Sequence, residues 1–251
     1  MTQKVLITGM SGLIGGALRN HMEGKYELSA LNRGAVEGVE CHQADISDLD
    51  AIRPAFQGKD TVVHLAAHVS VPGEFADMLK YNVIGAYNVF EAAREAGVKR
   101  VVFASTGAVI AGVERHEPYK TLAEARYEEA TPGWPMIDHN SPVQPRGLYG
   151  CSKVWGESLA RHFSDTSNMS VICVRIGRVT AEDRPMKPRE KAVWCSLRDI
   201  AGLLEACVAA PADLKFDIVF GVSNNKYGYR DMEHAREALG FVPQDSAEDF
   251  D

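Results

Sequence analysis

The sequence of 251 residues predicts an α/β fold in which helices cover both faces of a parallel, doubly wound sheet. Two observations lead to this prediction. Short apolar runs alternate with helical segments along most of the chain, which is typical of successive βαβ units. A glycine-rich turn also separates the first apolar run from the first helix. The length and the 45% hydrophobic content suffice for one large core, so we expect a single domain over residues 1–251.

The elements are expected in the following order. Apolar runs predict strands at residues 5–7, 26–31, 39–46, 61–67, 100–106, 170–176 and 216–220. Helical spacing predicts helices at residues 17–22, 48–52, 75–96, 149–163, 197–209 and 231–239, with one further candidate at 122–129. Gly97 is placed to cap the helix at 75–96. The polar, Pro-rich segment 112–146 is typical of a binding loop or lid, and we expect a small substrate-binding part built from about 112–146 and 178–251.

Charge and composition exclude several classes of partner. The net charge of −7 and the isoelectric point near 5.6 argue against binding to nucleic acid or to an anionic membrane surface. No apolar run approaches the ~18 residues of a membrane-spanning helix, and residues 5–7 are too short for the core of a signal peptide. The five cysteines are an odd number without metal-ligand spacing. We therefore expect free thiols, no metal site and a cytoplasmic protein.

The glycine turn itself predicts dinucleotide binding and hence a Rossmann-type fold. Gly9 permits the sharp reversal after the strand, Gly12 lets the backbone approach a pyrophosphate, and Gly15 lets the helix pack close to the strand. The amides at the helix start favour the phosphates. We expect further cofactor contacts from the neighbouring residues Ser11, Leu13 and Ile14. The alternative interpretation is an ordinary tight turn between a strand and a helix.

The end of the second strand bears on the choice between NAD and NADP. An acidic residue at this point binds the ribose 2′-hydroxyl of NAD, whereas an arginine accommodates the 2′-phosphate of NADP. Here Asn32 occupies the acidic position and Arg33 follows it. We therefore expect NADP rather than NAD, although Arg33 could also be a solvated loop charge. His64, inside an apolar strand, is interpreted as a core histidine.

Tyr149 and Lys153 stand four residues apart at the start of a helix and therefore share one face of it. A tyrosine with an ordinary pKa near ~10 is a poor base at neutral pH. A neighbouring ammonium group and a cationic nicotinamide ring would lower that pKa. The phenolate could then take the proton of a substrate hydroxyl while hydride leaves to the cofactor. The alternative is a surface pair without chemistry.

An ordered set of motifs resembles the extended short-chain dehydrogenase/reductases, the family of NAD-dependent sugar epimerases and dehydratases. The set spans about residues 4–210 and comprises Thr8-Gly9-x-x-Gly12-x-x-Gly15, Asp45-Ile46, His64-Leu65-Ala66-Ala67, Asn82-Val83-x-Gly85, Ser105-Thr106 and Tyr149-x-x-x-Lys153. The resemblance implies that Thr106 orients the substrate oxygen, Tyr149 is the acid/base and Lys153 binds the ribose. It also implies cofactor contacts for Asp45, Ile46, Leu65, Ala66, Ala67, Asn82 and Ile176, although Asn82 could instead be structural. Family members often form homodimers through the two helices that begin here near Phe75 and Tyr149.

Within that family the sequence is most similar to the uronate dehydrogenases. That likeness implies that Arg189 binds a sugar carboxylate, as a bidentate guanidinium can, and that Ser70 and Thr106 contact the substrate. Arg189 could instead belong to a solvated charged loop. The sequence departs from the pattern at Gly107-Ala108, where uronate dehydrogenases have Asn-His in contact with the sugar, and in the longer segment 112–146.

Three functions remain open from the sequence. The first is an NAD(P)-dependent oxidoreductase that acts on a secondary alcohol of a sugar or sugar acid. The second is a nucleotide-sugar epimerase or dehydratase with tightly bound NAD. Gly107-Ala108 offers no acidic pair for a dehydratase, and the short C-terminal half leaves little room for a nucleotide sugar. The third is a catalytically silent dinucleotide-binding protein, a class that typically lacks the Tyr or the Lys.

Overall fold

The computed structural model describes residues 2–69 and 75–250, and its described strands form one seven-stranded parallel sheet of order β3-β2-β1-β4-β5-β6-β7. The strands are β1 (Lys4–Thr8), β2 (Glu27–Asn32), β3 (Glu40–Gln43), β4 (Thr61–His64), β5 (Arg100–Thr106), β6 (Ser170–Ile176) and β7 (Phe216–Gly221). The chain winds outward from β1 to β3 and then crosses back to β4 beside β1. The strand order therefore reverses between β1 and β4, which is where open α/β sheets bind ligands.

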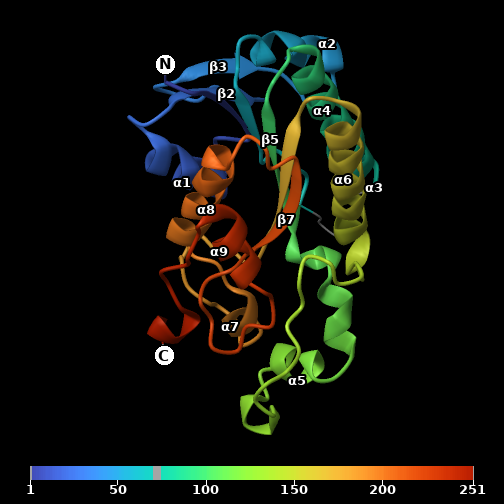
Figure 1. Cartoon of the computed structure of the whole chain (residues 1–251), viewed down its shortest axis with the longest axis vertical. Coiled ribbons are helices and arrows are strands. Elements are labelled where there is room, and N and C mark those ends of the chain that lie inside the picture. Colours follow the sequence, from blue (N-terminus) through green and yellow to red (C-terminus); the bar gives the residue numbers. More distant parts are fainter. Residues whose placement is uncertain (1, 70–74, 251) are drawn as a thin grey trace.

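Helices cover both faces of the sheet (Figure 1). One face carries α1 (Leu13–Met22), α8 (Leu197–Ala209) and α9 (Glu233–Leu239). The other face carries α2 (Leu49–Ile52), α4 (Gly85–Glu95) and α6 (Gly147–Thr166). Successive side chains of a strand point to opposite faces, so Leu6 packs with the second group of helices while Val5 and Ile7 pack with the first. The predicted doubly wound architecture is confirmed.

Short elements extend beyond the carboxyl end of β5, at the bottom of Figure 1. They are α5 (Tyr119–Ala123), α7 (Glu190–Val193) and the 3₁₀ turns Gly107–Val109, Ala111–Arg115 and Tyr127–Glu129, and a further 3₁₀ turn, Ala247–Phe250, closes the described chain. A third cluster of buried apolar residues, which includes Val109, Leu122, Val193 and Tyr229, joins these elements to the C-terminal part of the chain. Residues far apart in the sequence thus meet beside the end of β5.

All seven expected strands are present, although β3 and β4 each end three residues before the predicted bound, at Gln43 and His64, and two expected helices also differ from the prediction. The helix expected at 75–96 is α3 (Phe75–Asp77), a π-helical stretch (Met78–Ile84) and α4 in succession. Gly97, with φ of +71°, ends it as expected. The candidate helix at 122–129 is wrong in its bounds, because α5 ends at Ala123 and Ala125 adopts a positive φ of 57° that breaks the helical path. Within residues 2–69 and 75–250, every helix is too short or too polar to cross a membrane.

Candidate active site

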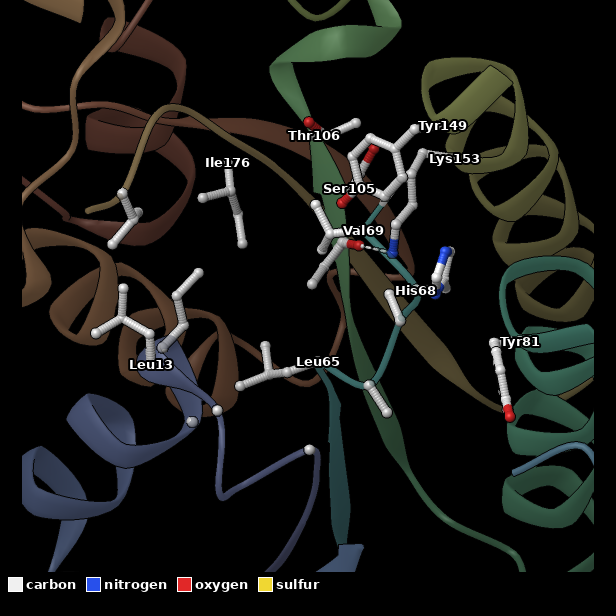
Figure 2. A pocket seen from close by; sticks show the side chains of 18 of the residues that line it. Leu13, Leu65, His68, Val69, Tyr81, Ser105, Thr106, Tyr149, Lys153 and Ile176 are labelled. Carbon is white, nitrogen blue, oxygen red and sulfur yellow. Dashed lines mark hydrogen bonds between the residues drawn. The ribbon is translucent and has the colours of Figure 1, made fainter. Parts of the chain in front are cut away.

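A cleft of about 900 Å³ opens at the carboxyl ends of the central strands. Its lining comes from the glycine turn after β1, the ends of β2, β4, β5 and β6, the start of α6, and Arg230 near the C-terminus. Figure 2 shows Tyr149 and Lys153 reaching from α6 toward the end of β5, with Ile176 and Leu13 on the opposite side. The cleft therefore lies at the strand-order reversal that the topology marks for ligand binding.

The glycine turn has the shape that the sequence predicts. Gly9 has φ of +74°, and a Cβ on it would lie 2.9 Å from the backbone nitrogen of Ala66. A Cβ on Gly15 would lie only 2.4 Å from the carbonyl oxygen of Gly9. Both glycines are required by close backbone approach, since real Cβ atoms need more than 3 Å. The turn thus brings the ten-residue helix α1 and its N-terminal amides up to the cleft, a geometry that suits a pyrophosphate.

Most residues expected to bind the cofactor line this cleft. They are Gly9, Ser11, Gly12, Leu13, Ile14, Gly15, Asn32, Arg33, Asp45, Ile46, Leu65, Ala66, Ala67, Tyr149, Lys153 and Ile176. Asn32 is almost fully buried: its Oδ1 accepts from the backbone nitrogen of Met10 (2.9 Å), and its Nδ2 donates to Ser11 Oγ (2.6 Å). Asn32 therefore fastens the glycine turn to the end of β2.

Positive charge surrounds Tyr81 at the β2 end of the cleft. The guanidinium carbon of Arg33 lies 5.5 Å from the centre of the Tyr81 ring, and Lys80 Nζ lies 4.9 Å from it. Lys80 also forms an ion pair with Asp45 at 3.0 Å. Burial alone would raise the pKa of Asp45, but hydrogen bonds from Ser47 and Lys80 hold it below its ordinary value. Asp45 therefore places a negative charge in the lining of the cleft, and the ion pair with Lys80 partly neutralises this charge.

Asn82 and His64 have structural contacts. Asn82 lies behind the cleft wall, where its side chain makes hydrogen bonds to both the backbone nitrogen and the carbonyl of His68 and to Ser152 Oγ. It is not among the residues that line the cleft, and the cofactor contact that the family resemblance implies for it stays a prediction. His64 Nδ1 lies 2.8 Å from Thr8 Oγ1, and burial, with the charge of Lys153, lowers its pKa to about 3. His64 is thus a neutral core histidine, as predicted.

Lys153 is held rigidly at the floor of the cleft. Its side chain is buried, and Nζ donates to the carbonyl oxygen of Ala104 at 2.7 Å. Nζ also lies 4.8 Å from the centre of the Phe103 ring and 5.9 Å from that of Tyr149. Burial lowers the pKa of Lys153 to about 8. The ammonium group therefore sits beside Tyr149, as the spacing on the helix predicts.

Tyr149 and Thr106 complete the predicted trio in the same part of the cleft. Thr106 ends β5, and its Oγ1 accepts from the backbone nitrogen of Ala108 at 3.2 Å, which fixes the hydroxyl at the start of the next turn. Burial raises the pKa of Tyr149 to about 12. This direction is opposite to the lowering expected from the Lys153 charge. The reason is that desolvation of the phenolate exceeds the attraction of an ammonium group 5.9 Å from the ring centre.

The predicted carboxylate ligand Arg189 lines the cleft but already holds a carboxylate of this chain. Its Nε and Nη2 donate to the two oxygens of Glu114 at 2.7 and 2.5 Å. Arg146 Nη1 and the Tyr229 hydroxyl donate to the same carboxylate. Burial would raise the pKa of Glu114, but Arg189, the Tyr229 hydroxyl and Arg230 together hold it below its ordinary value. Ser70, the other predicted substrate ligand, falls outside the described residues.

Sequence reasoning missed three other arginines that line the cleft, Arg146, Arg178 and Arg230. They come from the two regions expected to bind substrate, 112–146 and 178–251. Arg230 is buried, and a Cβ on Gly107 would lie 2.5 Å from its Nη2. The available signal was the small pair Gly107-Ala108, where the sequence departs from the uronate dehydrogenase pattern. The guanidinium of Arg230 fills the space that a side chain at position 107 would take.

Comparison with known proteins agrees with this geometry. Residues 5–202 match the NAD dependent epimerase/dehydratase family. The chain is 32% identical to an NAD-dependent glucose-6-phosphate dehydrogenase of Haloferax volcanii, covering 100% of this chain and 96% of that one. It is 35% identical to a uronate dehydrogenase of Agrobacterium fabrum, with coverage of 99% and 87%. The crystal structure of uronate dehydrogenase from Agrobacterium tumefaciens is similar, with a TM-score of 0.83, 34% identity, and coverage of 99% of this chain and 86% of that one.

These findings confirm both the Rossmann-type fold and the resemblance that the motifs carry. The matched span includes the glycine turn, Thr106, Tyr149 and Lys153, which the structure brings to one cleft. The likeness to the two curated relatives runs over nearly the whole chain. The chain belongs to the NAD dependent epimerase/dehydratase family of extended short-chain dehydrogenase/reductases.

Proposed function

We propose that the protein is an NAD(P)-dependent oxidoreductase that oxidises or reduces a secondary alcohol on a sugar or sugar acid. One observation carries this proposal: Thr106, Tyr149 and Lys153 converge at one end of the cleft whose other end begins at the dinucleotide-binding turn. The relatives named for glucose 6-phosphate, uronate and L-arabinose oxidation support the substrate class.

The residues present fit a dinucleotide. Gly9, Gly12 and Gly15 line the cleft, and the close backbone approach at Gly9 and Gly15 brings the amides at the start of α1 to it. Leu13, Leu65 and Ile176 supply apolar walls farther along the cleft (Figure 2). When bound, the cofactor supplies the hydride donor or acceptor and, in its oxidised form, a positive charge near Tyr149. Lys153 is placed to hold the ribose.

The proton steps belong to the chain's own residues. At neutral pH, Tyr149 carries its proton and is set to donate it to a carbonyl oxygen during reduction. In oxidation Tyr149 accepts the hydroxyl proton, and positive charge at Lys153 favours the phenolate that this requires. The Thr106 hydroxyl holds the substrate oxygen beside Tyr149. The carbonyl of Ala104 keeps Lys153 in place throughout.

NADP is the proposed cofactor. The end of β2 offers no carboxylate to a ribose 2′-hydroxyl, because Asn32 stands there and its side chain is occupied by the glycine turn. Arg33 is exposed and lines the cleft, and its guanidinium carbon lies 5.5 Å from the centre of the Tyr81 ring. A 2′-phosphate would meet the guanidinium of Arg33 there, which is the arrangement that favours NADP over NAD.

A homodimer is proposed from the outer face of two neighbouring helical segments. The segment from α3 to α4 and the helix α6 pack against each other. Both carry large apolar side chains that are at least 40% exposed: Phe75, Leu79, Ile84, Tyr87, Leu148 and Trp155. Such a patch commonly marks a protein interface. Light scattering should give twice the monomer mass for the wild-type protein and the monomer mass for Trp155→Glu. A monomeric wild-type protein would refute the proposal.

The catalytic proposal is tested by following nicotinamide absorbance with purified protein. NADP and NAD are each supplied with a panel of free sugars, uronates and sugar phosphates. Reduction of cofactor that disappears in Tyr149→Phe supports the proposed dehydrogenase. If the cofactor stays bound through purification and no sugar gives net cofactor reduction, the result would favour the nucleotide-sugar epimerase over the dehydrogenase.

A further inference from the structure

Arg230 places a buried positive charge in the cleft next to the catalytic end. The residue is only 3% exposed, and its Nε and Nη1 make no hydrogen bond to any described residue. The hydroxyl of the adjacent Tyr229 is committed to Glu114 at 2.6 Å. Buried charged groups are normally paired and hydrogen-bonded, because an unpaired charge loses its hydration without compensation. Arg230 therefore keeps two buried donors that no described group satisfies.

Gly107 determines where the guanidinium of Arg230 lies. A Cβ on Gly107 would lie 2.5 Å from Arg230 Nη2 and 2.8 Å from Nη1, so the guanidinium packs directly on the glycine backbone. Gly107 follows Thr106, whose hydroxyl lines the same cleft. An anion held by Arg230 would consequently belong to the molecule whose alcohol or carbonyl meets Thr106.

The charged side chains around Arg230 indicate how much negative charge a ligand of this site can carry. Four arginines line this end of the cleft: Arg146, Arg178, Arg189 and Arg230. Two carboxylates oppose them, since Glu114 pairs with Arg146 and Arg189, and Glu190 pairs with Arg178. Four arginines against two carboxylates give a formal excess of two positive charges, and because Arg146 and Arg178 are more than half exposed, the buried part of this excess lies on Arg230. Burial is the main cause that lowers the pKa of Arg230, and the charge of Arg189 lowers it further, whereas Tyr229 and Glu114 raise it.

We infer that the substrate is a phosphorylated sugar whose phosphate monoester binds Arg230. A phosphate monoester carries about −1.5 to −2 charge at pH 7, which matches the formal excess of two positive charges, whereas a uronate carboxylate carries one. The planar guanidinium fork suits phosphate oxygens. Arg189 is unsuited to this role because Glu114 already occupies both of its inner donors. The inference rests on the proposed oxidoreductase function and names its substrate class.

The test compares wild type with Arg230→Met, with Arg161→Met as the matched control because Arg161 is an exposed arginine on α6 that forms an ion pair with Asp165 away from the cleft. Cofactor reduction is measured with hexose and pentose phosphates, their unphosphorylated parents and the corresponding uronates. Wild type should prefer phosphates, and Arg230→Met should lower that preference by about 100-fold, mainly through KM, as expected from losing two charge-assisted hydrogen bonds. The control should keep the preference.

A second readout does not depend on turnover. Inorganic phosphate, titrated calorimetrically into protein saturated with cofactor, should bind wild type and Arg161→Met at least ~10-fold more tightly than Arg230→Met. Gly107→Ala offers an independent variant, since its methyl group must displace Arg230 Nη2 and should weaken phosphate binding in the same direction. Cofactor affinity and melting temperature report whether each variant is folded.

The outcomes separate the two proposals. Tyr149-dependent reduction without a phosphate preference, or with a preference for uronates that depends on Arg230, would overturn the phosphate assignment and leave the oxidoreductase standing. Phosphate binding that depends on Arg230, with no reduction of any sugar, would support the anion site and refute the proposed reaction. Equal phosphate affinity in wild type, Arg230→Met and Gly107→Ala would overturn the inference.

Discussion

Glu157 on α6 and Arg175 on β6 form a buried bidentate ion pair, with Arg175 Nε and Nη2 donating to the two carboxylate oxygens at 2.9 and 2.8 Å. Ser105 Oγ donates to the same carboxylate at 2.6 Å. Glu157 lies one helical turn beyond Lys153, and Ser105 immediately precedes Thr106. The pair therefore fixes the helix that carries Tyr149 and Lys153 against the strand that ends at Thr106.

Breaking this pair should destabilise the fold strongly. Arg175→Met leaves the Glu157 carboxylate buried without its cation, and such losses typically amount to about 3–5 kcal/mol of unfolding free energy. Urea unfolding followed by circular dichroism measures the change. Arg161→Met removes one partner of an exposed ion pair on the same helix and should cost no more than about 1 kcal/mol. Similar small effects in both variants would show that the buried pair does not hold α6.

Arg33 should determine cofactor preference. Arg33→Ala removes the cation nearest the expected 2′-phosphate, so kcat/KM for NADP should fall by roughly 10-fold while the value for NAD stays nearly constant. Steady-state kinetics with both cofactors measures the ratio. Arg94→Ala, on the exposed side of α4 and paired with Glu91, is the control. An unchanged ratio would mean that Arg33 is a solvated loop charge.

Lys153 should make stability depend on alkaline pH. Burial lowers its folded pKa from 10.5 to about 8, so between these values the unfolded chain keeps a proton that the folded chain has released. The unfolding free energy of wild type should therefore rise relative to Lys153→Met as the pH goes from about 8 to 10.5, by up to ~3 kcal/mol. Denaturant unfolding of both proteins at pH 7 and pH 10 measures this difference. A constant difference would contradict a lowered pKa.

The strands and the cofactor half of the cleft could be predicted because their signals are local. Gly9 adopts a positive φ at the turn, Gly15 is required by backbone contacts within the turn itself, and each strand is an apolar run of its own. Tyr149 and Lys153 share a helix, so their spacing alone places them together. The π-helical stretch Met78–Ile84 leaves no such signal, because an apolar stripe is compatible with either helix type.

The substrate half of the cleft could not be predicted because it depends on tertiary contacts. Glu114, Arg189 and Tyr229 come from three distant segments of the chain. No local sequence pattern predicts the ion pair between Arg189 and Glu114 or the hydrogen bond from Tyr229 to Glu114. Arg230 reaches Gly107 across more than a hundred residues of sequence. The raised pKa of Tyr149 likewise follows from burial, which the helical spacing does not reveal.

The central claim is that Tyr149 performs proton transfer on a sugar substrate in the cleft, and one variant tests it most directly. Tyr149→Phe removes only the hydroxyl, so the protein should still bind NADP with wild-type affinity by fluorescence titration. Its rate of NADP reduction on the preferred sugar should fall by about 10²–10⁴-fold, the usual contribution of a general acid–base group. Wild-type turnover by Tyr149→Phe, with cofactor bound, would contradict this account of the site.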